Sequence, residues 1–155
     1  MTIKIVRTSD TDLLATLNHD VQEIHHNIEP EIFKPYNKEN MKRLFDDALE
    51  NENASAYIAY FDDEVAGYML LNKRYSEANC FKKSYSALLI DQICVESHFK
   101  GKGIGKALVE FEKAYAKDFD ISRIEMNYWT KNNNSGEFFR SQGFENYNER
   151  LAIKI

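Results

Sequence analysis

The alternation of apolar and polar residues predicts strands and helices along the whole chain. Apolar residues at every second position, or in short runs, predict strands at residues 3–7, 54–61, 64–75, 86–95 and 123–129. Apolar residues spaced by three and four predict amphipathic helices at residues 11–27, 38–50, 103–117 and 133–142. A last hairpin is predicted around residues 146–150. Pro30 and Pro35 predict a loop between the first two helices.

The order of these elements predicts a mixed α/β fold in one domain over residues 1–155. We expect a mostly antiparallel central sheet of about six to seven strands, with helices on both faces. Asp62 and Asp63 separate two strand patterns and predict an antiparallel hairpin. The strand at 86–95 is the most apolar, which is typical of a strand buried on both faces and places it centrally in the sheet. The chain contains no repeat, linker or low-complexity segment.

Composition and charge exclude several classes of protein. The longest unbroken apolar run, Ala56–Phe61, is far shorter than the roughly 20 residues of a membrane-spanning helix. The formal net charge is −5, with 20 basic and 25 acidic residues, which disfavours nonspecific binding to nucleic acid. The first residues lack the pattern of a signal peptide, and Cys80 and Cys94 form no disulfide framework. We therefore expect a cytoplasmic protein without nucleic-acid or membrane partners.

Residues 100–106, Lys-Gly-Lys-Gly-Ile-Gly-Lys, join the apolar strand to the third predicted helix. The unpaired N–H groups of a first helical turn attract an anion, glycines let it approach the backbone, and lysines add charge, so the segment suits a pyrophosphate. A Walker A loop is excluded because Lys100 and Ala107 stand where it needs Gly and Ser/Thr. A dinucleotide fingerprint is excluded because Lys106 replaces its last glycine. A plain glycine-rich turn with solvated lysines remains the alternative.

This loop and its surroundings resemble the GNAT superfamily of N-acetyltransferases. The family's pattern Arg/Gln-x-x-Gly-x-Gly/Ala matches residues 100–105, with Lys in the first place. Residues 90–95 resemble the family's fourth strand, along which acetyl-CoA lies. Residues 125–132, followed by Phe-Phe-Arg-Ser-Gln-Gly-Phe at 138–144, resemble a second motif in which an Asn precedes a helix ending in Phe-Tyr-x-x-x-Gly-Phe. The resemblance covers residues from about 85 to 145.

The resemblance implies acetyl-CoA as co-substrate and a map of its contacts. The strand backbone would pair with the pantetheine arm, the loop would hold the pyrophosphate, and Asn132 would hydrogen-bond the pantetheine. Phe139 stands where many members have a Tyr beside the CoA sulfur. The implied cofactor-binding residues are Ile93, Cys94, Val95, Lys100, Gly101, Lys102, Gly103, Ile104, Gly105, Lys106, Asn132 and Phe139.

The implied reaction is direct attack of a primary amine on the thioester of acetyl-CoA. An amine with a pKa of about 10.4 must first lose a proton, and the resemblance places Asp91 where several members have a catalytic carboxylate. The alternative role for Asp91 is structural hydrogen bonding within the strand. Phe139 cannot donate a proton to the leaving thiolate, so Tyr128, Tyr147 or water are the candidates. Cys94, in a strand predicted to be buried and with no His motif nearby, fits a small apolar residue better than a nucleophile.

The residues that would bind the amine acceptor are predicted from the first two helices and the loop between them. The family builds its acceptor pocket from the first helices and the following loop, which points to His25 and Phe33 as substrate-binding residues. Glu29 and Glu31 in that loop would favour a cationic small-molecule amine. No metal site is predicted, because His19 and His26 fall on a solvated helix face.

Three functions are weighed on these grounds. An acetyl-CoA-dependent N-acetyltransferase, able to form a homodimer, is favoured. The alternative is an acyl-CoA-binding sensor or regulatory module with little catalysis, which the Phe at position 139 would suit. A nucleotide site at the glycine loop is the third, and it predicts stabilisation by ATP rather than by acetyl-CoA.

Overall fold

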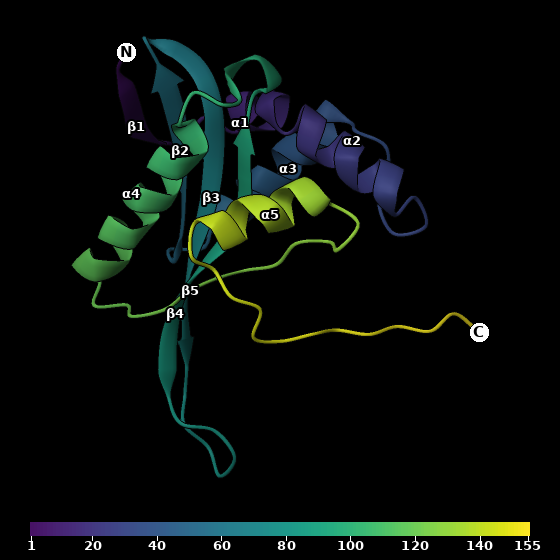
Figure 1. Ribbon diagram of the computed structural model, residues 1–155, viewed down its shortest axis with the longest axis vertical. Coiled ribbons are helices and arrows are strands. Elements are labelled where there is room, and N and C mark those ends of the chain that lie inside the picture. The colour runs from purple at the N-terminus through teal and green to yellow at the C-terminus, as the bar shows by residue number, and fades with distance from the viewer.

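The computed structural model describes all residues 1–155 and contains one five-stranded sheet with helices on both faces (Figure 1). The strands lie in the order β1-β2-β3-β4-β5, and only the β4–β5 pair is parallel. This confirms the predicted mixed, mostly antiparallel α/β fold. The strands are β1 (Ile3–Thr8), β2 (Ala54–Phe61), β3 (Glu64–Ser76), β4 (Tyr85–Val95) and β5 (Ile124–Met126).

Five α-helices and one 3-10 turn connect these strands. The predicted helix at 11–27 is divided in two at Asn18, whose side chain is buried. No helix is both long enough and apolar enough to span a membrane. The helices are α1 (Thr11–Leu17), α2 (His19–Ile28), α3 (Lys38–Leu49), α4 (Ile104–Asp118) and α5 (Asn133–Ser141), and the 3-10 turn is η1 (Ser97–Phe99).

The strand count is lower than predicted, and the hairpin predicted around residues 146–150 is wrong. Residues 142–155 contain no helix or strand, and in Figure 1 the yellow C-terminal segment runs away from the sheet. Residues 145–155 are exposed, and the side chains of Leu151 and Ile153, just beyond the predicted hairpin, are 90% and 88% exposed. Local pattern alone does not form a strand without a partner and a surface to bury it.

The helices bury both faces of the sheet in two separate cores. One core joins α4 to the sheet through residues such as Leu88, Ile90 and Leu108, and it includes Phe139 of α5. The other joins α1 and α3 to the opposite face through Leu14, Phe45, Ile58 and Tyr68. The inner strands are therefore covered on both sides, which explains why their sequences are so apolar. β4 lies inside the sheet, as predicted, but next to the short edge strand β5.

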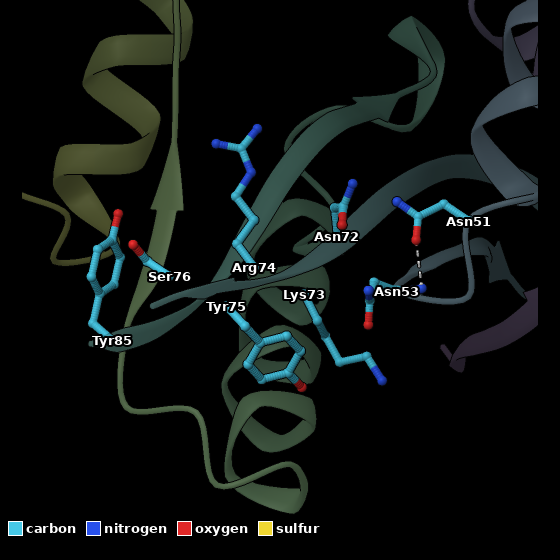
Figure 2. A pocket seen from close by; sticks show the side chains of 8 residues that line it. All are labelled: Asn51, Asn53, Asn72, Lys73, Arg74, Tyr75, Ser76 and Tyr85. Atoms are coloured by element: carbon cyan, nitrogen blue, oxygen red, sulfur yellow. Dashed lines mark hydrogen bonds between the residues drawn. The ribbon is translucent and has the colours of Figure 1, made fainter. Parts of the chain in front are cut away.

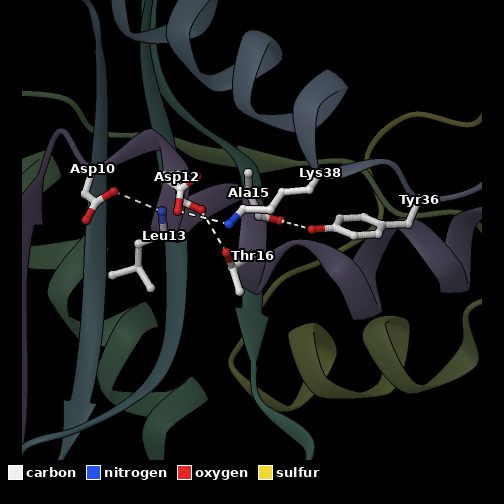
Figure 3. Close-up of polar contacts among 7 residues, drawn as sticks. All are labelled: Asp10, Asp12, Leu13, Ala15, Thr16, Tyr36 and Lys38. Carbon is white, nitrogen blue, oxygen red and sulfur yellow. Dashed lines mark hydrogen bonds and ion pairs between the residues drawn. The ribbon is translucent and has the colours of Figure 1, made fainter.

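Polar contacts hold the loop between α2 and α3 against α1 (Figure 3). Asp10 caps α1 by accepting a hydrogen bond from Leu13 N at 2.9 Å. Tyr36, in the loop, donates its hydroxyl hydrogen to Ala15 O at 2.8 Å, and Lys38 pairs with Asp12 at 3.0 Å. The loop that contains both prolines is thus fixed at its C-terminal end.

Candidate active site

The two parallel strands of the sheet separate at one end and leave an opening. β5 pairs with β4 only at Leu88–Ile90, whereas β4 continues to Val95 with β3 as its only neighbour. On the side facing β5, residues 91–95 therefore have no partner strand for their backbone N–H and C=O groups. Such an edge can accept an extended molecule as if it were an added strand. Ile93, Cys94 and Val95, the predicted pantetheine contacts, lie on this edge.

Helix α2 runs across the opening, from β4 to the segment that follows β5. At its start, Asn18 Nδ2 donates to Gln92 Oε1 of β4 at 3.0 Å. At its end, Lys131 Nζ pairs with Glu29 at 2.7 Å and donates to the Ile28 carbonyl at 3.2 Å. A ten-residue helix is about 15 Å long, against about 4.8 Å between paired strands. Helix α2 therefore spans the opening and forms one of its walls.

Asp91 lies in a β-bulge at the narrow end of this opening. Leu70 pairs with Gln92 and Leu71 pairs with Ile90, so Asp91 has no partner on β3. Asp91 as a residue is exposed, but desolvation of its carboxyl group raises its pKa, an effect that Arg74 and Asn72 partly oppose. A carboxylate with a raised pKa is a better proton acceptor than an ordinary Asp.

A buried hydrogen-bond network fixes the residue next to Asp91. Tyr68 donates to Gln92 Oε1 at 2.7 Å, and Asn18 Nδ2 donates to the Tyr68 hydroxyl at 2.9 Å. Tyr68 has no exposed surface, and burial raises its pKa far above the usual value, so it remains neutral and does not serve as an acid. No pattern in the sequence predicts this network, because its members come from three separate parts of the chain: the junction of α1 and α2, β3 and β4.

The glycine loop lies between η1 and α4, where the sequence places it. Gly101 and Gly103 have φ values of 77° and 84°, in the left-handed region that favours glycine. Gly103 is the N-cap of α4, and no atom lies within 4 Å of where a Cβ at either glycine would stand. Lys102 is placed over the rings of Phe61 and Phe99, at 5.1 and 4.9 Å from their centroids. The open backbone and the first-turn N–H groups of α4 fit a pyrophosphate.

Helix α5 packs directly on the start of α4. A Cβ on Gly105 would stand 2.9 Å from the Phe138 ring, so this glycine permits the close approach of the two helices. Asn132 caps α5 by accepting a hydrogen bond from Ser135 N at 3.3 Å, which leaves its side-chain NH₂ group free for another acceptor. Phe139 is only 4% exposed and packs against Phe138 and Phe144, with centroids at 5.0 and 5.3 Å. The predicted contact of Phe139 with the cofactor stays a prediction.

Comparison with known proteins decides the family. Residues 19–144 match the model of the acetyltransferase (GNAT) family. The chain belongs to the GNAT family. An uncharacterized N-acetyltransferase in the pepI 3′ region of Lactobacillus delbrueckii subsp. lactis is 28% identical over 116 residues, which cover 72% of this chain and 66% of that protein.

Solved GNAT-like structures share the fold over the whole chain. A mutant of the BH1408 protein from Bacillus halodurans is 19% identical with a TM-score of 0.85, covering 100% of this chain and 99% of its own. The acetyltransferase AAC(6′)-Iy, in complex with a bisubstrate analogue of CoA and acetylneamine, is 15% identical with a TM-score of 0.74, and the coverage is 100% and 99%. At these identities the likeness concerns the fold.

The candidate proton donors of this GNAT protein differ in position. Tyr128 follows β5 on the side of the opening, and its hydroxyl oxygen accepts a hydrogen bond from Arg140 at 2.8 Å. Tyr147 is 64% exposed, and its ring centroid lies 4.4 Å from Cζ of Arg123. Arg123 directly precedes β5, at the end of this strand away from the opening. Tyr128 is therefore the better placed of the two tyrosines.

Burial raises the pKa of Cys94 to about 12, so its thiol stays protonated and is a poor nucleophile.

The predicted acceptor residues come together with a third aromatic residue. His25 of α2 stacks on Phe33 with ring centroids 4.8 Å apart, and Phe33 contacts Trp129 edge-on at 5.2 Å. Burial lowers the pKa of His25, so its ring is neutral at pH 7. Sequence reasoning missed Trp129, which it placed within a strand, because its contact with Phe33 joins segments far apart in the chain.

Outside the opening, the structure has a polar cavity and no cluster of metal-ligating side chains. His, Cys, Asp and Glu side chains form no group of three or more that could hold a metal ion. A polar cavity lies between the β3–β4 hairpin and the turn before β2, lined by asparagines, Lys73, Arg74 and two tyrosines (Figure 2). Figure 2 shows Arg74 and Tyr75, two of its lining side chains, pointing away from each other.

Proposed function

We propose that this GNAT protein is an N-acetyltransferase that moves an acetyl group from acetyl-CoA to the primary amine of a small molecule. The observation that supports it most is the open edge of β4, which leads directly to the glycine loop at the start of α4. This edge and loop offer unpaired backbone groups first to an amide-containing arm and then to a pyrophosphate. The AAC(6′)-Iy complex, with its CoA-containing analogue, adds support for the cofactor.

The residues present fit acetyl-CoA along its length. Ile93, Cys94 and Val95 would bind the pantetheine arm through their backbone, and the N–H groups of residues 101–106 would bind the pyrophosphate. Lys100 and Lys106 are exposed and take part in no salt bridge, so both would be available to the phosphates. Acetyl-CoA supplies an acetyl group activated as a thioester. The protein orients the acetyl group toward the acceptor. One proton must leave the amine, and one must reach the leaving thiolate.

Asp91 is the proposed general base. At pH 7, deprotonating an amine of pKa 10.4 costs about 4.6 kcal/mol, which a base close to the amine can help to supply. Asp91 stands at the bulge beside the opening, and its raised pKa suits this role. Gln92, held by Asn18 and Tyr68, keeps the backbone of the bulge in place.

The test is release of the CoA thiol with a panel of amines. We expect transfer to at least one primary amine, with formation of the acetylated product shown by mass spectrometry. The second candidate, an acyl-CoA-binding module, is favoured by Phe139, which has no hydroxyl and is buried. Tight binding of acetyl-CoA without transfer to any amine of the panel would support this second candidate and contradict the first.

We further propose that residues 1–155 act as one catalytic domain in the cytoplasm, as a homodimer, without nucleic-acid or membrane partners. The net charge of −5 is in keeping with the absence of polyanionic partners. Light scattering of the purified protein tests the dimer directly, because the 18.1 kDa chain would give about twice that mass.

A further inference from the structure

Three aromatic rings from distant parts of the chain form a cluster at the wall of the opening. The cluster consists of His25 of α2, Phe33 of the following loop and Trp129 beyond β5. Trp129 is 37% exposed, so part of the cluster faces solvent. Ile24 and Ile32, which precede His25 and Phe33 in the sequence, are 40% and 60% exposed. Exposed aromatic surface of this kind is typical of a binding site.

The loop that carries Phe33 is held in place before any ligand arrives. His26 Nδ1 donates to the Phe33 carbonyl at 2.8 Å, and Gln22 Nε2 donates to the Lys34 carbonyl at 2.7 Å. Glu23 accepts from Tyr36 N at 2.9 Å. These bonds join the loop to three residues of α2, at positions 22, 23 and 26. A fixed ring loses little conformational freedom when a ligand packs on it.

The acidic residues beside the cluster are neutralised by lysines. Glu29 pairs with Lys131 at 2.7 Å, and Glu31 pairs with Lys154 at 2.6 Å. On α2, Asp20 and Glu23 have no lysine partner: Asp20 contacts the His19 ring at 3.0 Å, and Glu23 accepts a hydrogen bond from Tyr36 N. The two glutamates were expected to attract a cationic acceptor, but the structure gives each of them a cation from the protein itself. A second positive charge on the acceptor would find no unpaired glutamate in this loop.

From these contacts we infer that the acceptor is a hydrophobic or aromatic amine with a single positive charge, whose apolar group packs on the His25–Phe33–Trp129 cluster. This inference rests on the proposed function and specifies its substrate class. His25 lies seven residues after Asn18, about 10 Å along the helix from the contact with Gln92. In the acceptor, a short chain would therefore separate the apolar group on the cluster from the reacting nitrogen, which would point toward Asp91.

Two amines of equal chain length provide the test. 4-Phenylbutylamine and 1,4-diaminobutane share a four-carbon chain and one primary amine, and differ in carrying a phenyl ring or a second ammonium group. We expect kcat/KM to be at least about tenfold higher for 4-phenylbutylamine. Trp129→Ala should raise KM for 4-phenylbutylamine about tenfold and leave KM for acetyl-CoA unchanged. Trp129→Phe, which keeps an aromatic ring, should restore most of the loss.

Binding is measured separately from catalysis, because Trp129 is the only tryptophan of the chain. Titrating the CoA-loaded protein with 4-phenylbutylamine should change the tryptophan fluorescence saturably, and 1,4-diaminobutane should not. Preferred transfer to 1,4-diaminobutane, or no effect of Trp129→Ala on KM, would overturn the inference and leave the proposed function intact. Transfer to neither amine nor to any other, with no fluorescence response, would overturn both.

Discussion

Asn18 Nδ2 donates a hydrogen bond to Gln92 Oε1 at 3.0 Å and thereby joins the start of α2 to the bulged part of β4. The same nitrogen donates to Tyr68, and the three side chains form one network. Asn18 is 2% exposed, and its Oδ1 atom is buried without a hydrogen-bond partner. The protein therefore retains an incompletely satisfied polar group at the position where the opening begins, in keeping with a role in positioning Gln92 and Asp91.

Replacing this asparagine should affect both stability and turnover. In Asn18→Leu, Tyr68 and Gln92 lose a buried donor, which should lower the free energy of unfolding by about 1–3 kcal/mol. Because Gln92 adjoins Asp91, kcat should also fall, while KM for acetyl-CoA stays near the wild-type value. Chemical denaturation and steady-state kinetics measure the two effects. Thr16→Ala, which removes an exposed side-chain hydrogen bond two residues earlier in the chain, is the control and should change neither.

The glycine loop can be tested with a pair of nearly isosteric substitutions. Gly103 has a φ of 84°, a conformation that Asn and Asp adopt more readily than other residues, and open space surrounds its Cβ position. Gly103→Asp should raise KM for acetyl-CoA at least about tenfold more than Gly103→Asn does, because its carboxylate repels the pyrophosphate. Equal KM values in the two variants would argue against an anion at this loop.

The role of Asp91 predicts a dependence of rate on pH. The pKa of Asp91 is raised, so kcat/KM of the wild type should decrease as pH falls through that raised value and the base becomes protonated. Asp91→Asn should lower kcat about 100-fold and lose this limb of the profile, with little change in acetyl-CoA binding. Glu110→Gln, an exposed carboxylate on α4, serves as the control. Wild-type and Asp91→Asn rates that agree from pH 6 to 9 would exclude Asp91 as the base.

The sequence predicted those parts of the molecule that depend on local pattern. The helix after the glycine loop and the apolar strand before it were found because their spacing and their glycines are local features. The bulge at Asp91 depends on its pairing with β3, and the division of the first helix at Asn18 goes with a contact to Gln92, 74 residues away; the spacing of apolar residues reveals neither. Trp129 was missed for the same reason, since its partner Phe33 lies in a distant loop.

The predicted strand count failed at the C-terminus for a different reason. The hairpin predicted around residues 146–150 has no partner strand, because the sheet ends at β5 and the residues that follow are exposed. A strand is stabilised by its partners more than by its own residues, so an edge of a sheet is hard to place from sequence.

Freeing Glu29 from its lysine should change the choice of acceptor. Lys131→Met keeps a long apolar side chain but leaves the Glu29 carboxylate unpaired near the aromatic cluster. We expect kcat/KM for 1,4-diaminobutane to rise several-fold, and that for 4-phenylbutylamine to change little. Lys113→Met, which removes an exposed pairing on α4, is the matched control. If Lys131→Met leaves the ratio of the two amines unchanged, the charge of Glu29 does not act on the acceptor.

Glu112 makes stability depend on pH at a site far from the chemistry. It lies on α4 with no exposed surface and no hydrogen-bond partner, and burial raises its pKa from 4.5 to about 8. Between these two pH values the folded protein keeps a proton that the unfolded chain has lost. The free energy of unfolding should therefore decrease as pH rises through this range, by up to about 1.4 kcal/mol per pH unit, and level off above pH 8.

Glu112→Gln removes the titrating group and keeps the shape of the side chain, so this contribution to the slope should disappear. Its free energy of unfolding, measured by urea denaturation from pH 5 to 9, should exceed that of the wild type increasingly toward pH 9. Glu110→Gln, two residues earlier but exposed and paired with Lys113, should keep the wild-type slope. If Glu112→Gln and the wild type lose stability in parallel as pH rises, the buried carboxyl group is not the source of the pH dependence.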